Sequence, residues 1–403
     1  MIPTNDDPDL RAPSARARLV VIAFGTLLSL VAAEFALRIA TSNTPYRVLP
    51  ANVRAEFTPA PGLMPGVTGT SVYSTNSDGI RGRSYPADEG LHILAVGGST
   101  TECLYLDDSE AWPALLESLL GGEAGRPPVW VGSVGVSGHG LAEHIQIARY
   151  LLPQLRIDWT VVLAGINDLV PLLRLAEDYR PEKEDPDLVR FLDKAFRSRP
   201  LADARWPAAF PTNLAGWHLA RRSIAILKRN WRAELTEGDL LVEDRAGLTY
   251  ARRREALRGV PVLDEIPDLG PALKRFEQNL RVMVDAVHEA DSRLLLLTQP
   301  SAWNAGLSPE HEALHWIAFL GSKQAPRARY ATPALEQAMR RFNETTLRVC
   351  RETEAECLDV ATAMADADRE LYYYDEVHLN ERGSRRLAEL IARWFRRAPG
   401  AKG

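Results

Sequence analysis

Two patterns of apolar and polar positions, one typical of strands and one of helices, alternate along most of the chain after residue 91. Short apolar runs that suit buried strands are followed by stretches in which apolar residues recur at helical spacing. The strand candidates are residues 92–96, 129–134, 159–164, 293–298 and 357–360. Such alternation is typical of a parallel sheet with helices on both faces, so we predict an α/β domain over residues 91–397 with about five parallel strands.

The alternation is interrupted between about residue 169 and residue 270. This stretch contains Trp206, Trp217, Trp231 and many arginines, and it is too long for a plain loop. We therefore predict a mostly helical insertion in the domain. Such an insertion would either cover a site or be a structural elaboration, and the sequence leaves both interpretations open.

The N-terminus shows a third pattern, an uncharged apolar run over residues 19–33 that follows three arginines. A helix over residues 19–40 would rise about 33 Å, enough to cross a hydrocarbon core of about 30 Å. We predict a single-pass transmembrane signal anchor there, with a cleaved signal peptide and a buried helix as the alternatives. The arginines favour a cytoplasmic tail over residues 1–18 and an extracytoplasmic main domain, periplasmic in a Gram-negative cell.

The segment before the predicted domain differs in composition from the rest. Residues 41–90 are rich in Pro, Gly, Ser and Asn, which predicts a tether with short strands.

Charge and cysteine content argue against two classes of protein. The chain carries 48 Lys and Arg against 53 Asp and Glu, and its net charge of −5 gives no reason to expect nucleic acid as a partner. Three cysteines are too few for a disulfide scaffold and lack the paired spacing of a structural zinc site. Whether Cys350 and Cys357 form a bridge stays open.

Four short polar segments carry the candidate chemistry, and three of them directly follow predicted strands. Ser99 lies in AVGGSTTE after the first strand, Gly138 in SVGVSGHG after the second, and Asn167 in AGINDL after the third. Open α/β sheets bind their ligands at this edge. The fourth segment, YYYDEVHLNERG, places Asp375 and His378 before the last predicted helix. We expect these side chains to share one crevice.

Each of these residue types suits one part of acyl transfer. A serine at a strand-to-helix turn is held exposed, a glycine lets a backbone N–H approach a reacting group, and an asparagine amide can donate to an oxyanion. In a D-x-x-H turn the carboxylate can orient the imidazole while the other ring nitrogen faces the serine. Two rival motifs fail on spelling, because Thr101 replaces the last glycine of G-x-S-x-G and Glu143 replaces the last glycine of a dinucleotide loop.

The quartet GGST, V-S-G, G-x-N-D and D-x-x-H, in this order on alternating β and α segments, resembles the SGNH (GDSL-like) hydrolase superfamily. The resemblance runs from His92 to Trp394, outside the predicted insertion. It implies a three-layer α/β/α, flavodoxin-like sheet. The chain departs from the common spelling at Gly98, where the family has aspartate, and at Ser133, where it has asparagine. The tether, TNSDGIRG and the anchor resemble membrane-bound bacterial members.

Carried over residue by residue, the resemblance implies a role for each candidate. Ser99 would be the nucleophile, His378 the general base and acid, and Asp375 the partner that orients His378. The oxyanion hole would be formed by the N–H of Ser99, the N–H of Gly138 and the amide of Asn167. The implied activity is hydrolysis of an acyl ester through a serine ester intermediate, without cofactor or metal.

The substrate class and three rival functions stay open from the sequence. We expect the acyl group to come from a glycan, a lipid or another envelope component, and the membrane to be contacted through the N-terminal helix. An O-acyltransferase of the same superfamily is one alternative. His311 and His315 spell H-E-x-x-H, which on a helix would bind zinc, so a zinc peptidase is the second. A non-catalytic envelope assembly protein is the third.

Overall fold

The computed structural model describes most of the chain. The described residues are 15–42, 46–86, 90–121, 128–181, 246–323 and 325–397. Residues 1–14 of the predicted tail and residues 182–245 of the predicted insertion lie outside them. The helical character predicted for that part of the insertion therefore stays a prediction.

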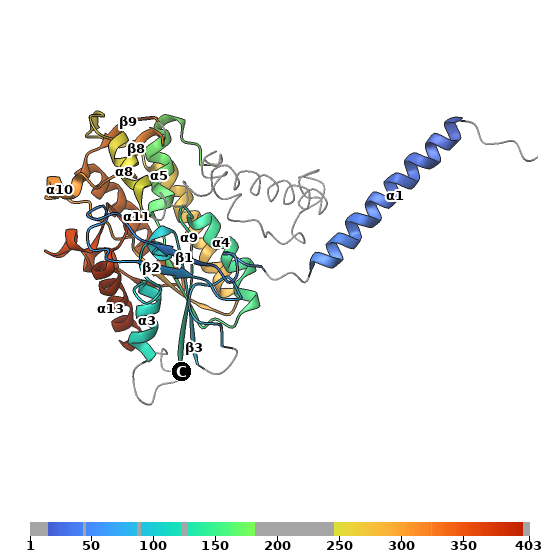
Figure 1. Ribbon diagram of the computed structural model, residues 1–403, viewed down its shortest axis with the longest axis horizontal. Helices are drawn as coiled ribbons and strands as arrows, with labels where there is room; N and C mark the ends of the chain where they lie inside the picture. Colours follow the sequence, from blue (N-terminus) through green and yellow to red (C-terminus); the bar gives the residue numbers. More distant parts are fainter. Residues whose placement is uncertain are drawn as a thin grey trace, which may run out of the picture. The chain divides into compact units, whose positions relative to one another are not determined.

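A parallel sheet of five strands forms the centre of the fold (Figure 1). Its strands are β3 (Leu91–Gly97), β4 (Val129–Gly135), β5 (Trp159–Leu163), β7 (Arg293–Leu297) and β10 (Glu356–Leu358). In space they follow the order β10-β7-β5-β3-β4, with every neighbouring pair parallel. If these five strands are renumbered 1 to 5 along the chain, the order is 5-4-3-1-2, which is the flavodoxin-like order. This confirms the predicted fold class and all five strand candidates.

Both faces of the sheet are buried, because successive strand residues point to opposite sides. Leu94 and Val96 belong to one hydrophobic core, and Ile93 and Ala95 to another. The first core is closed by α4 (Leu141–Tyr150), α5 (Ile166–Leu175), α9 (Gly270–His288) and α11 (Thr332–Glu352). The second is closed by α3 (Trp112–Gly121) and α13 (Glu381–Arg397), which lie side by side (Figure 1). This arrangement is the predicted three-layer one.

Smaller elements surround this framework. The short helices are α2 (Ser99–Glu102), α8 (Leu248–Ala256), α10 (Pro309–Glu312) and α12 (Val360–Ala363), with 3₁₀ turns η1 (Leu152–Gln154), η2 (Ala176–Asp178) and η4 (Arg369–Tyr372). The strands β6 (Val262–Leu263), β8 (Phe319–Ser322) and β9 (Ala325–Tyr330) form a separate sheet. Cys350 at the end of α11 and Cys357 in β10 form a disulfide, which answers the question that the sequence left open.

The described part of the predicted tether, residues 46–86, packs onto the folded unit. It contains an antiparallel pair, β1 (Arg54–Phe57) and β2 (Ser71–Ser74). Arg81 is 4% exposed, and its guanidinium donates to Asp108 Oδ1 at 2.7 Å and to the carbonyl of Leu106 at 2.7 Å. It also donates to the carbonyls of Cys103 and of Glu102, the last residue of α2. An upstream arginine therefore fixes the C-terminal end of α2.

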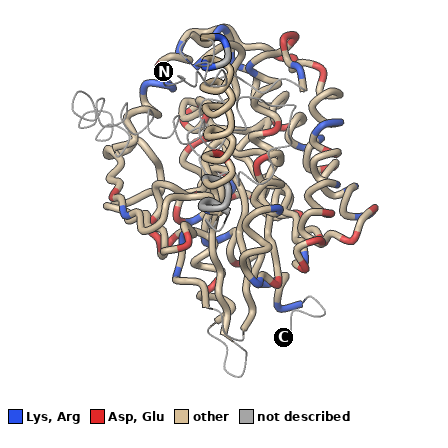
Figure 2. The backbone as a smooth tube through the Cα atoms, turned by 90° about the vertical axis from the view of Figure 1, so that its right-hand side faces the viewer, with Lys and Arg blue, Asp and Glu red and all other residues tan. Residues whose placement is uncertain are grey.

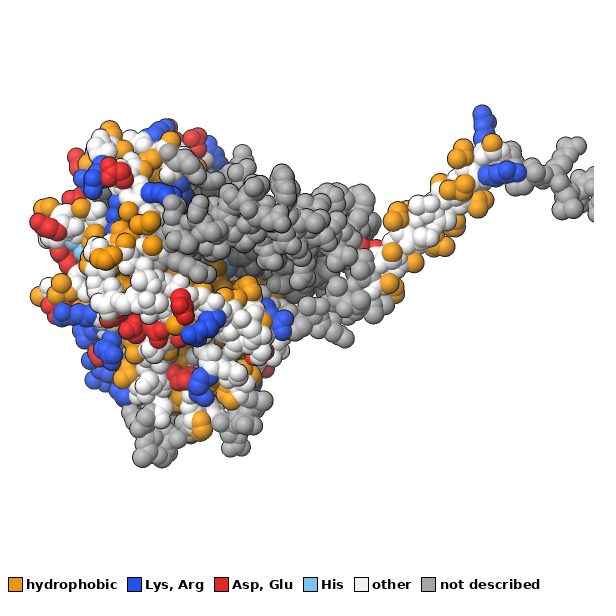
Figure 3. Space-filling view, viewed as in Figure 1, with side chains coloured by type: hydrophobic (Ala, Val, Ile, Leu, Met, Phe, Trp, Pro, Cys, Tyr) orange, Lys and Arg blue, Asp and Glu red, His pale blue; other side chains and the backbone are white. Residues whose placement is uncertain are grey.

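The helix α1 (Ala15–Ser42) forms a unit separate from the sheet domain. Its segment Arg18–Ala36 is long and apolar enough to span a membrane, a property that membrane anchors share with signal sequences. None of this segment is buried, and its large apolar side chains are 58–70% exposed (Figure 3). In the sheet domain, by contrast, basic and acidic residues are interspersed along the helices and loops (Figure 2).

Candidate active site

Ser99 lies where the central strand β3 passes into α2, of which it is the first residue. Its side chain is half-buried. Ser99 Oγ lies 2.8 Å from His378 Nε2, although the two residues are 279 positions apart in the chain. The flavodoxin-like order reverses direction between β3 and β5, and the crevice at such a reversal is where open α/β sheets bind ligands. The sheet topology therefore places Ser99 at the favoured position for a reaction.

Asp375 and His378 form a compact turn that ends at this crevice. His378 Nδ1 lies 2.6 Å from Asp375 Oδ2, and the side chain of Asp375 is fully buried. Asp375 Oδ1 accepts the backbone N–H groups of Val377 at 3.0 Å and His378 at 2.8 Å. The structure thus brings Ser99, His378 and Asp375 into one hydrogen-bonded chain.

The two ionisable members of this chain influence each other's pKa. Burial by itself would raise the pKa of Asp375, but the adjacent His378 and the hydrogen bonds to the carboxylate lower it below its usual range. Burial would also lower the pKa of His378, and the Asp375 carboxylate outweighs it, so the pKa of His378 lies above its usual value. The pair therefore favours a charged carboxylate that stabilises a protonated imidazole.

Gly138 and Asn167 lie beside the Ser99 turn. Gly138 has φ +85°, a conformation that glycine adopts without steric cost. Asn167 Nδ2 donates to the carbonyl of His139 at 2.8 Å, which ties the amide to the Gly138 loop. A Cβ at Gly98 would lie 2.3 Å from Asn167 Nδ2 and 3.1 Å from the His139 carbonyl. The glycine that departs from the G-D-S spelling is thus the residue that leaves room for the Asn167 amide next to Ser99.

A partly buried carboxyl group close to Ser99 was missed by the sequence analysis. Glu102 lies one helical turn after Ser99 on α2, and its carboxylate accepts the N–H of Ser137 at 2.9 Å and the Ser137 hydroxyl. Burial raises the pKa of Glu102. Ser137 precedes Gly138, so Glu102 connects α2 to the Gly138 loop. Its spacing of three from Ser99 was the signal that could have found it.

Aromatic rings surround His378 and were also missed. The ring of Tyr374 is parallel to the imidazole with centroids 5.5 Å apart, and the ring of Trp316 is parallel to it at 6.1 Å. Tyr250 meets the imidazole edge-on at 6.2 Å. Tyr374 is adjacent to Asp375 in the sequence and could have been noticed there. Trp316 and Tyr250 are brought in by distant segments, and no local pattern marks them.

The H-E-x-x-H segment does not form the helical pair that zinc binding requires. The helix α10 ends at Glu312, and the rings of His311 and His315 lie at 83° with centroids 5.8 Å apart. His311 Nε2 contacts the carbonyl of Asp375 at 3.0 Å, and Glu312 forms an ion pair with Arg329. Within the described ranges, no cluster of three or more His, Cys, Asp or Glu residues is arranged to hold a metal ion.

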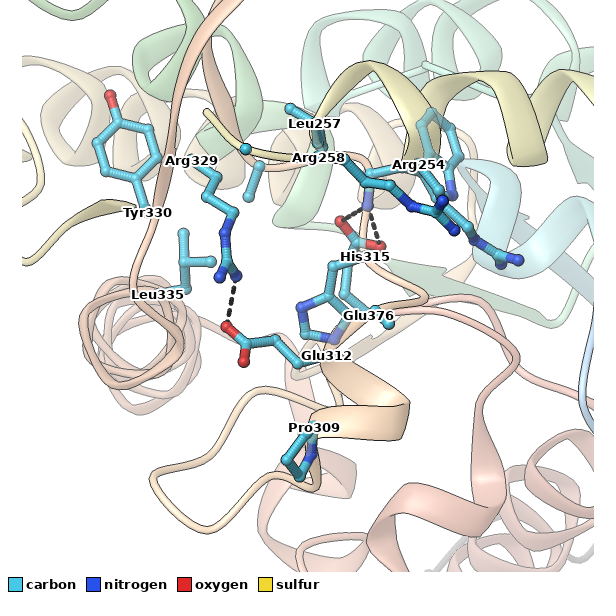
Figure 4. Close-up of a pocket in the computed structure, with 14 residues that line it drawn as sticks. Arg254, Leu257, Arg258, Pro309, Glu312, His315, Arg329, Tyr330, Leu335 and Glu376 are labelled. Atoms are coloured by element: carbon cyan, nitrogen blue, oxygen red, sulfur yellow. Dashed lines mark hydrogen bonds and ion pairs between the residues drawn. The ribbon is translucent and has the colours of Figure 1, made fainter. Parts of the chain in front are cut away.

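A cavity of about 230 Å³ borders the site on the side of Trp316 and Glu376 (Figure 4). Its polar lining is largely engaged already, because Arg329 pairs with Glu312 and Arg254 donates to three backbone carbonyls. Neither Ser99 nor His378 lines this cavity. It is therefore separate from the atoms of the hydrogen-bonded chain.

Comparison with known proteins gives one family match and several structural likenesses. A sequence model described as the GDSL-like Lipase/Acylhydrolase family matches residues 95–386. Among solved structures, the chain is similar to an acetylxylan esterase from Geobacillus stearothermophilus, with 13% identity, a TM-score of 0.39 and coverage of 76% of this chain and 94% of that one. It is also similar to a lipase/acylhydrolase from Enterococcus faecalis, with 13% identity, a TM-score of 0.38 and coverage of 76% and 95%. No curated protein matches the sequence.

Proposed function

Because this chain belongs to the GDSL-like lipase/acylhydrolase family and is a hydrolase of ester bonds, we propose that it is a serine esterase with Ser99 as the nucleophile. One observation carries the proposal. Ser99 Oγ, His378 and Asp375 are linked by contacts of 2.8 and 2.6 Å at the crevice of the sheet. A serine that shares a hydrogen bond with an imidazole, itself oriented by a buried carboxylate, is the arrangement that activates a hydroxyl for acyl transfer.

The reaction then proceeds in two halves. His378 Nε2 takes the proton of Ser99 as Oγ bonds to the ester carbonyl carbon, and the carbonyl oxygen becomes an oxyanion. The N–H groups of Ser99 and Gly138 and the amide of Asn167 stabilise this charge. His378 next gives its proton to the departing alcohol oxygen, which leaves an acyl ester on Ser99. Water, deprotonated by His378, attacks that ester and releases the acid, and the proton returns to Ser99.

Active-site labelling tests the proposal directly. A fluorophosphonate phosphorylates an activated serine hydroxyl, so it should modify the wild-type protein at Ser99 and leave Ser99→Ala unmodified. Mass spectrometry of the peptide that contains residue 99 identifies the adduct. An esterase that is fully active after exposure and carries no adduct at Ser99 would overturn the proposed nucleophile. A silent assembly protein would neither react with the probe nor hydrolyse esters.

The pH dependence of kcat/KM should follow the protonation of His378. The imidazole accepts a proton only when it is neutral, and its pKa lies above the usual value of about 6.5 because Asp375 stabilises the charged form. We therefore expect kcat/KM to fall as the pH drops through that raised pKa and to reach a plateau above it. Initial rates with p-nitrophenyl acetate, corrected for spontaneous hydrolysis, measure this acidic limb. A rate independent of pH between about 5 and 8 would contradict His378 as the base.

Asn167→Ala is expected to lower kcat about 10²–10³-fold with a much smaller change in KM, because an oxyanion donor acts mainly in the transition state. Asn343→Ala is a matched control, since the Asn343 amide also donates to a backbone carbonyl, that of Gln299 at 3.0 Å. Steady-state kinetics of both variants, with their melting temperatures, separate the two effects. Equal losses of kcat in both would argue against an oxyanion role for Asn167.

We further propose that α1 anchors the enzyme in a membrane and that the sheet domain acts outside the cytoplasm on an acylated glycan, lipid or other envelope ester. The uncharged run, with Arg16 and Arg18 at its N-terminal end, supports this orientation. Alkaline extraction of membranes and a periplasmic reporter fused after residue 397 test anchoring and orientation. Product analysis with an added sugar alcohol distinguishes release of free acid from transfer of the acyl group to a hydroxyl.

A further inference from the structure

The segment His311–Trp316, spelled H-E-x-x-H-W, contacts the Asp375–Glu376 turn at several points. His311 Nε2 donates to the carbonyl of Asp375 at 3.0 Å, and Trp316 Nε1 donates to Asp375 Oδ2 at 2.9 Å. The backbone N–H of Trp316 donates to the Glu376 carboxylate at 3.0 Å (Figure 4). His311, the first residue of the motif that would suggest zinc, therefore holds the backbone of Asp375, and Trp316, which follows the motif, holds its carboxylate.

The Asp375 carboxylate is saturated with donors. Oδ2 accepts from His378 Nδ1 and from Trp316 Nε1, while Oδ1 accepts two backbone N–H groups. An ionised carboxylate offers about four acceptor sites, so each of these contacts takes one of them. Rotation of the carboxylate would break several contacts at once. Trp316 supplies the one side-chain donor other than His378 among these contacts.

The indole of Trp316 also packs against the imidazole that Asp375 orients. Its ring is parallel to that of His378 within 5°, with centroids 6.1 Å apart, and the residue is 8% exposed. Tyr374 is likewise parallel to His378, within 6°. Arg253 lies over the Trp316 ring, with its guanidinium carbon 4.4 Å from the centroid. Trp316 thus contacts the imidazole of His378 with its ring and the carboxylate of Asp375 with its N–H.

We propose that Trp316 is a positioning residue for the Ser99–His378–Asp375 chain, and that the segment His311–Trp316 holds Asp375 in place through its hydrogen bonds. This inference rests on the proposed serine esterase function. A hydrogen bond to a carboxylate spreads its negative charge and makes it less basic. Without the Trp316 N–H, Asp375 holds a proton on His378 more strongly and its carboxylate is freer to turn. The imidazole is then aligned with Ser99 less often and is neutral only at higher pH.

Trp316→Phe removes the N–H and keeps an aromatic ring in place. We expect kcat to fall about 10-fold, in keeping with the loss of one hydrogen bond to a charged group, with little change in KM. We also expect the acidic limb of kcat/KM to move to higher pH. A merely structural loss would lower the amount of active enzyme at every pH and leave this limb in place.

Trp303→Phe is the matched control. Trp303 is fully buried, and its indole N–H has no hydrogen-bond partner in the part of the chain that the structure describes. The substitution therefore costs the same loss of ring volume without removing a donor to Asp375. An acidic limb that moves equally in both variants, or in neither, would overturn the proposal for Trp316.

Two further measurements distinguish failure of the Trp316 proposal from misfolding of the variant and from failure of the proposed function. If Trp316→Phe does not fold, benzothienylalanine at position 316 replaces the N–H by sulfur with nearly the same shape, and the same shift of the acidic limb is expected. Fluorophosphonate labelling of the wild-type protein is run in parallel. Absence of an adduct at Ser99 contradicts the proposed function itself, whereas normal labelling with an unshifted limb in the position 316 variants contradicts only the role of Trp316.

Discussion

Ser99→Ala is expected to lower kcat for short-chain esters by about 10⁴–10⁶-fold, the largest effect of any substitution considered for this protein. Without Oγ no serine ester can form, and the oxyanion donors alone support only a small residual rate above that in water. The fold should persist, because Ser99 is half-buried and alanine suits the first turn of α2. Initial rates with p-nitrophenyl acetate measure the loss.

The exposed Ser109 provides the control for this substitution, and Ser109→Ala should retain wild-type kcat. A metal chelator completes the comparison, since it tests the zinc alternative. Hydrolysis that survives Ser99→Ala but disappears with the chelator would overturn the serine mechanism. Loss in Ser99→Ala together with no effect of the chelator would leave the acyl chain length as the next question.

Asp375→Asn is expected to cost about 10⁴-fold in kcat. An amide can present its NH₂ to Nδ1 of His378, which favours the tautomer whose proton is on Nε2. That nitrogen then faces Ser99 as a donor and cannot accept the hydroxyl proton. The carboxylate that raises the pKa of His378 is also lost, so the acidic limb should move to lower pH. Single-turnover kinetics over a range of pH measure both effects.

Glu376→Gln is the neighbouring control for Asp375→Asn. Glu376 is equally buried, but its oxygens accept the backbone N–H groups of Trp316 and Ile317 and do not contact the imidazole. Because an amide oxygen can still accept these bonds, the loss of kcat should be far smaller than for Asp375→Asn. Similar losses in the two variants would mean that the turn as a whole, and not the Asp375 carboxylate, carries the effect.

The parallel strands could be predicted from the sequence because their signal is local. Each is a short apolar run, and burial on both faces leaves little other use for such a run. Ser99, Gly138 and Asn167 could be placed together for a related reason. Each follows a strand of the same sheet, and parallel strands end at the same edge.

The residues that surround His378 could not be predicted from local sequence patterns. Trp316 and Asp375 are 59 positions apart, and their contact depends on how a loop after β7 folds back. The H-E-x-x-H spacing suggests a metal site only if one helix continues through both histidines, and α10 ends before the second. The contacts that residues 46–86 make with the sheet domain, such as those of Arg81 with Asp108 and with the carbonyl of Leu106, join positions far apart in the sequence, so composition does not reveal them.

Arg81 limits how this enzyme can be recombined with its relatives. The family match begins at residue 95, yet the guanidinium that binds Asp108 and the carbonyls at the end of α2 lies upstream of it. A chimera that grafts only residues 95–386 onto another leader would leave this carboxylate and these carbonyls without their partner. A chimera should therefore start at Tyr46, where the packed segment begins. The first residue of the family match, residue 95, is not the first residue that the folded domain needs.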